Sequence, residues 1–369
     1  MKITCDKQKL NEAVLNTQRA VSAKSSVPAL EGILIRTEEN VITLCGYDLE
    51  LGITTTIEAS VSEPGSVVLS ARLFGEIARR LPADTVTLSS DEKQVTTIVS
   101  GDAKYSVVGI PAQEYPELPA VGSEASLQIS GNILRSMIRQ TLFAVAENDA
   151  RPVHTGTLFE LEPEKLRLVS VDGYRLAIRE EPIPCSLKTS FVVPGKTLGE
   201  ILKLLGDEDE EIELQIGRRH ILFHIKNYTV VSRLLEGEFL DYRAALPKDS
   251  STEVRVSVQN FIKSVERVSL LITDRLKSPV RCVFGDDGIH VSCSTAIGRA
   301  NDRLKAEISG EAVEMGFNNR FLLDALRNTE CDEVRILLNG PLSPMRVFPP
   351  DGESFLFLVL PVRLKSSNE

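Results

Sequence analysis

The stretch VPALEGIL at residues 27–34 decides the fold, because the chain uses it more than once. It follows a segment with helical spacing of apolar residues and opens a strand of alternating polarity. The same join recurs as RPVHTGTL at 151–158 and, less closely, as SPVRCV at 278–283. Its prolines are residues 28, 152 and 279, so the intervals are 124 and 127 residues. The 369 residues therefore hold three similar units, each the size of a small domain rather than of a solenoid repeat.

A second landmark keeps the same spacing. EYPELP at 114–119 closes the first unit, and EFLDYR at 238–243 closes the second. Short polar linkers fall near 120–125 and 248–252, so we expect three domains, at 1–122, 123–249 and 250–369.

Each unit reads as strand, helix, several strands, helix, several strands. Hairpins dominate over βαβ crossovers, which predicts an α+β fold with antiparallel sheets. In the first unit, strands are expected at 2–5, 30–36, 41–45, 51–58, 66–69, 85–89, 94–99 and 104–109. Helices are expected at 7–22, 71–81, 131–146, 195–205, 258–271 and 319–328.

Composition excludes several classes of protein. Apolar residues make up 42% and charged residues 25%, as in an ordinary globular chain rather than a disordered or fibrous one. No apolar run approaches the 18 residues of a membrane helix, and the N-terminus does not resemble an export signal. Six scattered cysteines without a C-x-x-C pair favour a reduced, cytoplasmic protein without structural zinc. A net charge of −10 argues against uniform phosphate binding, and aromatic residues at 5% are few for stacking single-stranded bases.

The predicted helices carry basic pairs opposite their apolar sectors. In helix 71–81 the apolar sector is Leu73, Phe74, Ile77 and Leu81. Exposed helix faces are often basic, so one such pair means little, but five of the six helices share the arrangement; helix 7–22 departs from it. The pairs are Arg72 and Arg79, Arg135 and Arg139, Lys196 and Lys203, Lys263 and Arg267, and Arg320 and Arg327.

The basic helices stand out against an acidic chain. Together the six helical segments carry about +9, which leaves about −19 for the rest. This segregation predicts that the helices face one polyanion while the sheets face elsewhere.

Packing geometry limits how the helices could surround a duplex. Helices pack about 8–10 Å apart, so six side by side close a circle roughly 17 Å across, with a hole under ~10 Å. B-DNA is at least ~16 Å across from its groove depths. Twelve helices leave a hole of about 24 Å, so a head-to-tail homodimer of three-unit chains is the smallest closed ring that fits.

The sequence contains little that indicates an enzyme. His220 and His224 have the spacing of a zinc motif but lie in an alternating strand without the required Glu, so we expect no metal. Neither a phosphate-binding glycine loop nor a G-x-S-x-G elbow occurs, and Asp48 and Asp172 read as turn residues rather than as a two-metal nuclease. We expect no catalytic residue and no cofactor.

Three motifs, in order and at their separations, resemble one family over the whole chain. They are VDGYRLA at 171–177, DYR at 241–243 with Leu246 and Pro247, and LPVRL at 360–364. The chain is similar to bacterial sliding clamps, the beta subunits of the replicative DNA polymerase III. The resemblance implies a ring-forming, head-to-tail homodimer with sheets outside and two helices per domain inside. Such a ring encircles double-stranded DNA without sequence specificity and tethers the polymerase for processive replication.

The resemblance also implies a pocket between the second and third domains for short partner peptides rich in Leu and Phe. The expected partners are the replicative polymerase, the clamp loader and repair polymerases, with no membrane contact. Three positions depart from the common pattern, namely His154, Leu240 and Ala244, and the tail 365–369 extends near the expected rim. The implied lining is His154, Val171, Gly173, Tyr174, Arg175, Leu176, Leu240, Leu342, Leu358, Val359, Leu360, Pro361, Val362 and Arg363.

Further contacts follow from the same resemblance. It places Leu271 and Ile272 of the third domain against Tyr105 and Val107 of the first domain of the partner subunit. It also adds two DNA-facing residues to the basic helix pairs, Lys24 and Asn148. Two alternatives stay open from the residues alone: a peptide-binding scaffold whose DNA contact is incidental, and a metal-dependent phosphoryl-transfer enzyme.

Overall fold

The computed structural model describes residues 1–122, 124–148, 150–207, 209–273 and 275–364. The described residues form two compact units, the first within 1–134 and 199–234 and the second within 135–198 and 235–364. The residue boundary between the units falls within two helices, α3 (Gly131–Leu142) and α4 (Gly195–Leu204).

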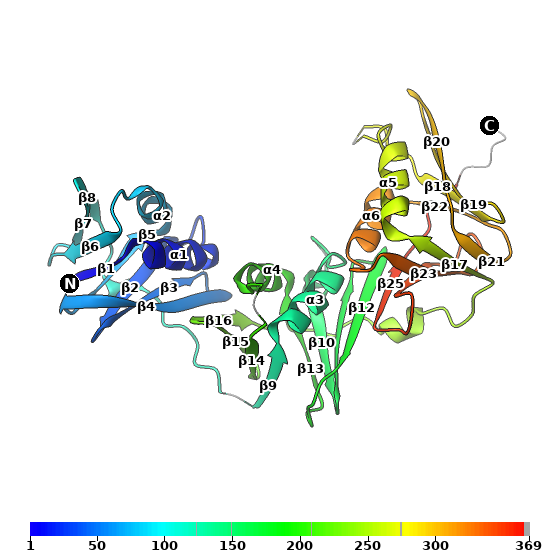
Figure 1. The fold of residues 1–369 in the computed structure, drawn as a ribbon. Helices are drawn as coiled ribbons and strands as arrows, with labels where there is room; N and C mark the ends of the chain where they lie inside the picture. The colour runs from blue at the N-terminus through cyan, green and yellow to red at the C-terminus, as the bar shows by residue number, and fades with distance from the viewer. Residues whose placement is uncertain (123, 149, 208, 274, 365–369) are drawn as a thin grey trace. The chain divides into compact units, whose positions relative to one another are not determined.

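The first unit holds a twelve-stranded antiparallel sheet, on which α1 and α2 pack side by side (Figure 1). Strands run in the order β8-β7-β6-β1-β4-β16-β15-β14-β9. From β4 a branch continues through β3 and β2 to β5. Its elements are β1 (Lys2–Asp6), α1 (Lys7–Thr17), β2 (Gly32–Glu38), β3 (Val41–Tyr47), β4 (Leu51–Glu63), β5 (Ser66–Ser70), α2 (Ala71–Arg80), β6 (Thr85–Ser90), β7 (Val95–Ser100), β8 (Ala103–Val108), β9 (Ala125–Ser130), β14 (Glu211–Ile216), β15 (His220–Ile225) and β16 (Tyr228–Arg233).

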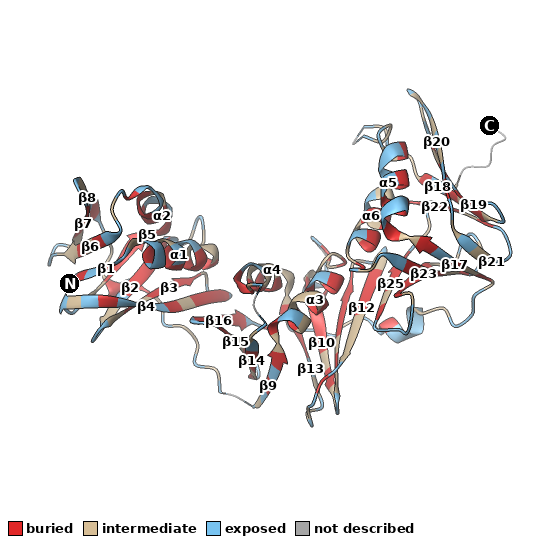
Figure 2. Cartoon of the chain, viewed as in Figure 1, coloured by how far each residue is buried: buried red, intermediate tan, exposed pale blue. Residues whose placement is uncertain are grey.

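The core of this unit lies between the helix pair α1–α2 and the sheet. Leu10 and Val14 of α1 and Phe74 of α2 are almost fully buried against strand residues such as Ile3 and Ile33. Asp6 accepts a hydrogen bond from the Lys9 backbone N–H, which caps the start of α1. The amphipathic pattern predicted for these two helices is therefore confirmed, because each buries one side and leaves the other exposed (Figure 2).

The second unit holds a nine-stranded and a four-stranded antiparallel sheet. Their orders are β13-β10-β11-β12-β25-β24-β23-β17-β21 and β20-β19-β18-β22. The elements are β10 (Gly156–Glu162), β11 (Lys165–Val171), β12 (Arg175–Pro182), β13 (Thr189–Pro194), β17 (Thr252–Ser257), α5 (Val258–Ser269), β18 (Val280–Gly285), β19 (Gly288–Thr295), β20 (Gly298–Leu304), β21 (Glu307–Gly310), β22 (Val313–Phe317), α6 (Asn319–Arg327), β23 (Glu333–Leu338), β24 (Met345–Phe348) and β25 (Phe355–Val359).

Helices α5 and α6 pack on each other, and α5 contacts strands of both sheets. Phe261 of α5 and Leu322 of α6 are fully buried with Phe284 and Phe317 of the small sheet and Phe357 of the large one. The α+β prediction with antiparallel sheets is thus confirmed, and the six described helices begin where the apolar spacing predicts them.

The repeated join has one structural form in its two close copies. Residues Pro28–Glu31 and Pro152–Thr155 each form a 3-10 turn that ends at a glycine, Gly32 or Gly156, at the start of a strand. A Cβ at Gly32 would lie 2.4 Å from the Val68 side chain, and one at Gly156 would lie 2.5 Å from the Val193 carbonyl oxygen. Only glycine allows this close strand approach. In the third copy Pro279 leads straight into β18, which explains its weaker match.

The structure corrects two details of the helices. Leu73, expected in the core of α2, is 47% exposed. The helices also end earlier than predicted: α1 gives way to a 3-10 turn at Gln18–Ala20, and α3 ends at Leu142.

Candidate functional site

A tight turn between β11 and β12 carries the VDGYR motif. Gly173 has φ +86°, a left-handed conformation that favours glycine. Asp172 Oδ1 accepts hydrogen bonds from the backbone N–H groups of Tyr174 and Arg175, at 2.9 and 3.0 Å. The turn sets Val171 opposite Leu176 in the sheet.

Arg175 connects this turn to helix α6. Its Nε lies 2.8 Å from Asp172 Oδ2, and its Nη1 lies 2.5 Å from Asp324 Oδ2. Its guanidinium also lies 4.6 Å from the ring centroid of Phe321, and the Tyr174 ring stacks on the same phenylalanine at 5.8 Å. The side chain is 11% exposed, so Arg175 is a structural link whose edge alone is accessible.

The C-terminal strand completes this surface. Strand β25 pairs with β12, which sets Leu358 opposite Leu176. Past the strand, the Leu360 N–H donates to the Tyr174 carbonyl at 2.9 Å, and the Val362 N–H donates to the Gly316 carbonyl at 2.8 Å. Backbone hydrogen bonds on both sides of Pro361 therefore hold the LPVRL segment to the VDGYR turn and to β22.

Two surface hollows include predicted pocket residues. One, of about 500 Å³, is lined by Leu240 with Val153 and Phe239; His154, next to Val153, is buried with its ring 5.6 Å from that of Phe239. The other, of about 570 Å³, is lined by Leu342, Val362 and Arg363 among others.

The predicted pocket residues thus form an accessible set and a buried set. Tyr174, Leu240, Leu342, Leu360 and Val362 are at least 36% exposed and could meet a ligand. Gly173 and Arg363 are also exposed, while Arg175 and Pro361 are partly so. The residues that can only support a pocket floor, because they are at most 5% exposed, are His154, Val171, Leu176, Leu358 and Val359.

Sequence reasoning missed other residues of this surface. Phe239 and Leu246 pack with the Leu176–Leu358 cluster, Phe321 lies under Tyr174, and Leu364 lines the same hollow as Leu342. For Phe239 the sequence does contain a signal, because it forms an apolar pair with Leu240 just before the DYR motif. The tail 365–369 lies outside the described residues.

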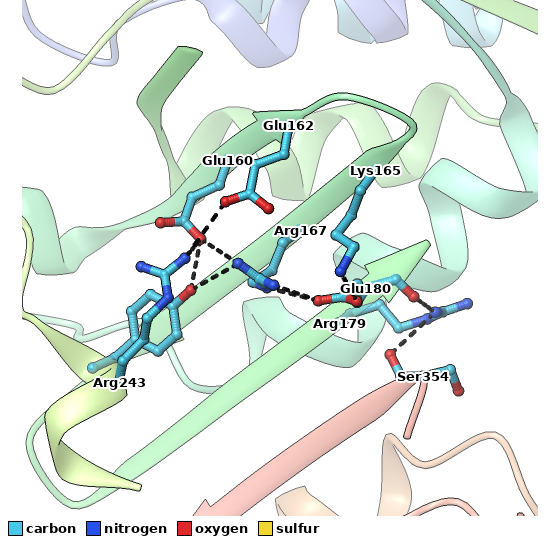
Figure 3. A network of polar contacts seen from close by, with 9 residues as sticks. Glu160, Glu162, Lys165, Arg167, Arg179, Glu180, Arg243 and Ser354 are labelled. Atoms are coloured by element: carbon cyan, nitrogen blue, oxygen red, sulfur yellow. Dashed lines mark hydrogen bonds and ion pairs between the residues drawn. The ribbon is translucent and has the colours of Figure 1, made fainter. Parts of the chain in front are cut away.

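A network of charges fixes the DYR segment to the sheet (Figure 3). Glu160 Oε2 accepts from the Tyr242 hydroxyl at 2.6 Å, from Arg167 Nη1 at 3.0 Å and from Arg243 Nη2 at 2.9 Å. Arg167 also donates to Glu180. Burial alone would raise the pKa of Glu160, but the hydrogen bonds from Tyr242 and Arg167 and the charge of Arg243 outweigh it and hold that pKa below its usual value.

The basic helix faces are accessible to solvent. Ten of the eleven predicted cations are exposed and Arg135 is partly so; Asn148 is exposed as well, while its neighbour at 149 lies outside the described residues. The apolar sides of α2, α5 and α6 are buried, so these cations lie opposite the core as the spacing indicates.

At least six of these cations have acidic partners, two of them three residues away on the same helix and four on other segments. The sequence pattern does not reveal the four carboxylates on other segments, because they lie far along the chain from their cations. The pairs are Arg79 with Glu76 (3.4 Å), Arg139 with Glu330 (3.6 Å), Lys203 with Glu200 (2.8 Å), Arg267 with Asp302 (2.9 Å), Arg320 with Glu147 (3.7 Å) and Arg327 with Glu266 (2.6 Å).

The residues expected at a subunit contact lie near two sheet edges. Tyr105 and Val107 belong to β8, an edge strand, but Val107 is 8% exposed within its own core. Leu271 and Ile272 are partly exposed and follow α5. The most accessible apolar side chains beside them, which the sequence did not single out, are Val108 at 75%, Leu270 at 81% and Ile297 at 65%.

The described residues do not form a metal site of the kind that the enzyme alternatives would need. His220 and His224 lie on strand β15, and His224 Nδ1 is 3.3 Å from Thr229 Oγ1. Among the described residues, no cluster of three or more His, Cys, Asp or Glu side chains could hold a metal ion. No described helix is long and apolar enough to cross a membrane.

Comparisons with known proteins account for these features. Sequence models of the DNA polymerase III beta subunit match in three consecutive parts: the N-terminal domain at residues 1–119, the central domain at 128–241 and the C-terminal domain at 243–363. The beta sliding clamp of Bacillus subtilis is 34% identical over 376 residues, which cover 98% of this chain and 100% of that protein.

Solved structures agree with the sequence matches. The DNA polymerase sliding clamp of Bacillus subtilis superposes with a TM-score of 0.95 at 33% identity, over 99% of this chain and 100% of that one. A sliding clamp of Pseudomonas aeruginosa bound to griselimycin gives 0.93 at 26% identity, with the same coverage. The chain therefore belongs to the family of DNA polymerase III beta subunits, the beta sliding clamps.

Proposed function

We propose that this protein is a sliding clamp that encircles duplex DNA as a head-to-tail homodimer and tethers the replicative polymerase for processive synthesis. The observation that carries the proposal is the match to all three domains of the beta subunit along essentially the whole chain. Members of this family are processivity factors rather than catalysts. The protein works where bacterial DNA is replicated, in the cytoplasm.

The charge arrangement of the helices supports holding DNA by topology rather than by tight binding. A protein that neutralises many phosphates binds with an affinity that falls steeply with salt. Here, acidic partners already compensate at least six of the exposed cations, as with Arg327 and Glu266. Each remaining attraction to phosphate is weak, which suits a ring that must move along its DNA.

Retention on circular and linear DNA tests this function. The clamp is loaded with a clamp loader onto a nicked circular plasmid and passed over a sizing column in high salt. We expect it to stay with the circle and to be released after a restriction enzyme cuts the plasmid once. Equal retention on circles and on linear DNA with free ends would contradict encirclement.

We further propose that partners bind through a short peptide at the surface around Tyr174, Leu360 and Val362. The accessible apolar side chains supply anchor sites, and Gly173 and Arg363 at the edge supply polar contacts. The Pseudomonas clamp solved with griselimycin shows that a clamp of this family binds a small ligand, so competition by griselimycin is a useful second assay.

A pair of substitutions tests the pocket. Leu176→Ala removes part of the buried floor and Leu360→Ala removes an accessible anchor contact, so together they should abolish binding of a Gln-Leu-x-Leu-Phe peptide. Sedimentation of the variant should still give a dimer, about twice 40.6 kDa. Unchanged peptide affinity would show that the pocket lies elsewhere.

The finer assignments belong to the same proposal. The domains are 1–122, 123–249 and 250–369, and the subunit contact joins Tyr105 and Val107 to Leu271 and Ile272 of the partner. The edge position of β8 and the exposed Leu270 beside Leu271 support this contact. Leu270→Asp should shift the protein toward monomer in sedimentation at micromolar concentration, whereas an unshifted dimer would place the contact elsewhere.

A further inference from the structure

A third hollow, of about 700 Å³, lies beside strands β18, β19 and β20 in the second unit. Four cationic side chains line it, namely Lys277, Arg281, Arg299 and Arg363, and no carboxylate does so among the residues the structure describes. The chain as a whole carries −10, so a hollow whose described charged lining residues are all cations departs from its average surface.

Three of the four cations are available to a ligand. Arg281 is held by Glu314 through two contacts, at 2.7 and 2.9 Å. The other three, Lys277, Arg299 and Arg363, are exposed and form no ion pair within the described part of the chain. The hydroxyls of Ser278, Ser292, Ser294 and Thr295 add hydrogen-bonding groups to the lining.

The hollow is continuous with the surface proposed to bind partner peptides. Lys277 also lines a neighbouring hollow of about 750 Å³ that includes Val362 and Asn318. Arg363 and Leu364 line both the basic hollow and the one that contains Leu342. A peptide anchored near Leu342 and Val362 therefore has a cation-lined path for the residues that flank its anchors.

We propose that this hollow binds carboxylate side chains in the flank of a partner peptide whose Leu and Phe anchors occupy the proposed pocket. The inference rests on that proposed pocket and adds a specificity element to it. Arginine binds carboxylates through two parallel N–H groups, and the lysine ammonium adds a mobile point charge.

The lining favours a peptide over a nucleic acid. Single-stranded nucleic acid is usually held by aromatic side chains that stack its bases along a basic groove. The described lining of this hollow has no aromatic side chain, and its free cations are three in number rather than a long stripe. Side-chain carboxylates next to an anchored segment match this small set of charges.

A set of fluorescent peptides tests the proposal on the intact dimer. The core peptide is Gln-Leu-Ala-Leu-Phe, extended at one end or the other by Glu-Asp-Glu or by the neutral Gln-Asn-Gln. At low salt we expect the acidic extension at one end to tighten binding about three- to tenfold over its neutral counterpart, since each exposed ion pair contributes modestly. The difference should shrink as salt rises.

Matched variants locate the effect. In Lys277→Gln/Arg299→Gln the acidic and neutral peptides should bind equally, while the core peptide keeps its affinity. The control, Lys188→Gln/Lys305→Gln, removes two exposed lysines from outside the hollow and should keep the difference. Sedimentation checks that both variants remain dimers.

The outcomes separate this inference from the function beneath it. If the core peptide binds but neither acidic extension helps, or if the gain survives in the Lys277/Arg299 variant, the basic hollow is not the flank site. A ten-residue oligothymidylate that binds through Lys277 and Arg299 while the acidic flank adds nothing would assign the hollow to nucleic acid and overturn the proposal. If the core peptide itself fails to bind, both the proposed pocket and this inference are wrong.

Discussion

The substitution Glu160→Gln removes one negative charge from the centre of the network that holds the DYR segment. Glu160 is 15% exposed, and its Oε2 accepts from Tyr242, Arg167 and Arg243 within 3.0 Å. A hydrogen bond to a charged group is worth about 1.5–3 kcal/mol, and the neutral amide keeps only part of this. Arg167 retains Glu180 at 2.8 Å, which limits the loss. We expect a net destabilisation of about 2 kcal/mol at neutral pH.

Calorimetry and urea unfolding measure this loss. For a unit of this size, about 2 kcal/mol corresponds to a fall of roughly 4–8 °C in the midpoint of thermal unfolding. The pH dependence gives a second measurement. Because the folded-state pKa of Glu160 is held below its usual value, its stabilisation is present above the unfolded pKa of about 4.3 and is lost as pH falls through the folded value. The gap between the native protein and the variant should therefore close in acid.

Glu162→Gln is the matched control. Glu162 is 45% exposed, and among the described residues its carboxylate reaches only Arg243, at 4.0 Å, so its loss should change stability by less than about 0.5 kcal/mol. A Glu160→Gln variant as stable as this control at pH 7, or a gap that stays constant down to acid pH, would refute the reasoning from the network.

Three further predictions follow from burial and backbone geometry. Phe74→Ala should cost about 3–5 kcal/mol in urea unfolding because Phe74 is 1% exposed, whereas Leu73→Ala on the same helix, 47% exposed, should cost well under 1 kcal/mol; equal costs would contradict the assigned helix face. Gly173→Ala should lose about 1–2 kcal/mol, since φ +86° is unfavourable for alanine, and a stable variant with native peptide affinity would count against this turn. Burial raises the pKa of the Cys282 thiol to about 12, so an alkylating reagent at pH 8 should modify the partly exposed Cys185 in the native protein and leave Cys282 intact, which mass spectrometry can check; alkylated Cys282 in folded protein would be the contrary result.

The sequence predicts the secondary structure well where local rules suffice. Strands of alternating polarity and the proline–glycine join locate the repeats, because the backbone approach at Gly32 and Gly156 leaves no room for a side chain. Helical spacing fails at Leu73, since a wheel gives only the direction of a side chain and not whether another element covers it. It also extends α1 past Thr17, where a 3-10 turn replaces the helix.

The site is less accessible to sequence reasoning than the fold. Helical spacing predicts which cations are exposed, but it does not predict partners that lie on other segments. Glu330, the partner of Arg139, lies far along the chain, and Asp302, the partner of Arg267, lies on strand β20. Likewise, the resemblance names Val359 and Leu360 together, and only the packing shows that the first is fully buried while the second is accessible.

The sheet junctions described above have a consequence for how such chains diverge. Strand β4 joins the first repeat to β16 of the second, and β12 joins the second to β25 of the third, in both cases through antiparallel backbone hydrogen bonds. Nearly every residue has the same backbone N–H and C=O groups, so these two strand pairs can form with many different side chains. Successive repeats can therefore differ widely in sequence while their strands still pair. The third repeat keeps the proline of the join without its glycine, and it still forms a continuous sheet with the second.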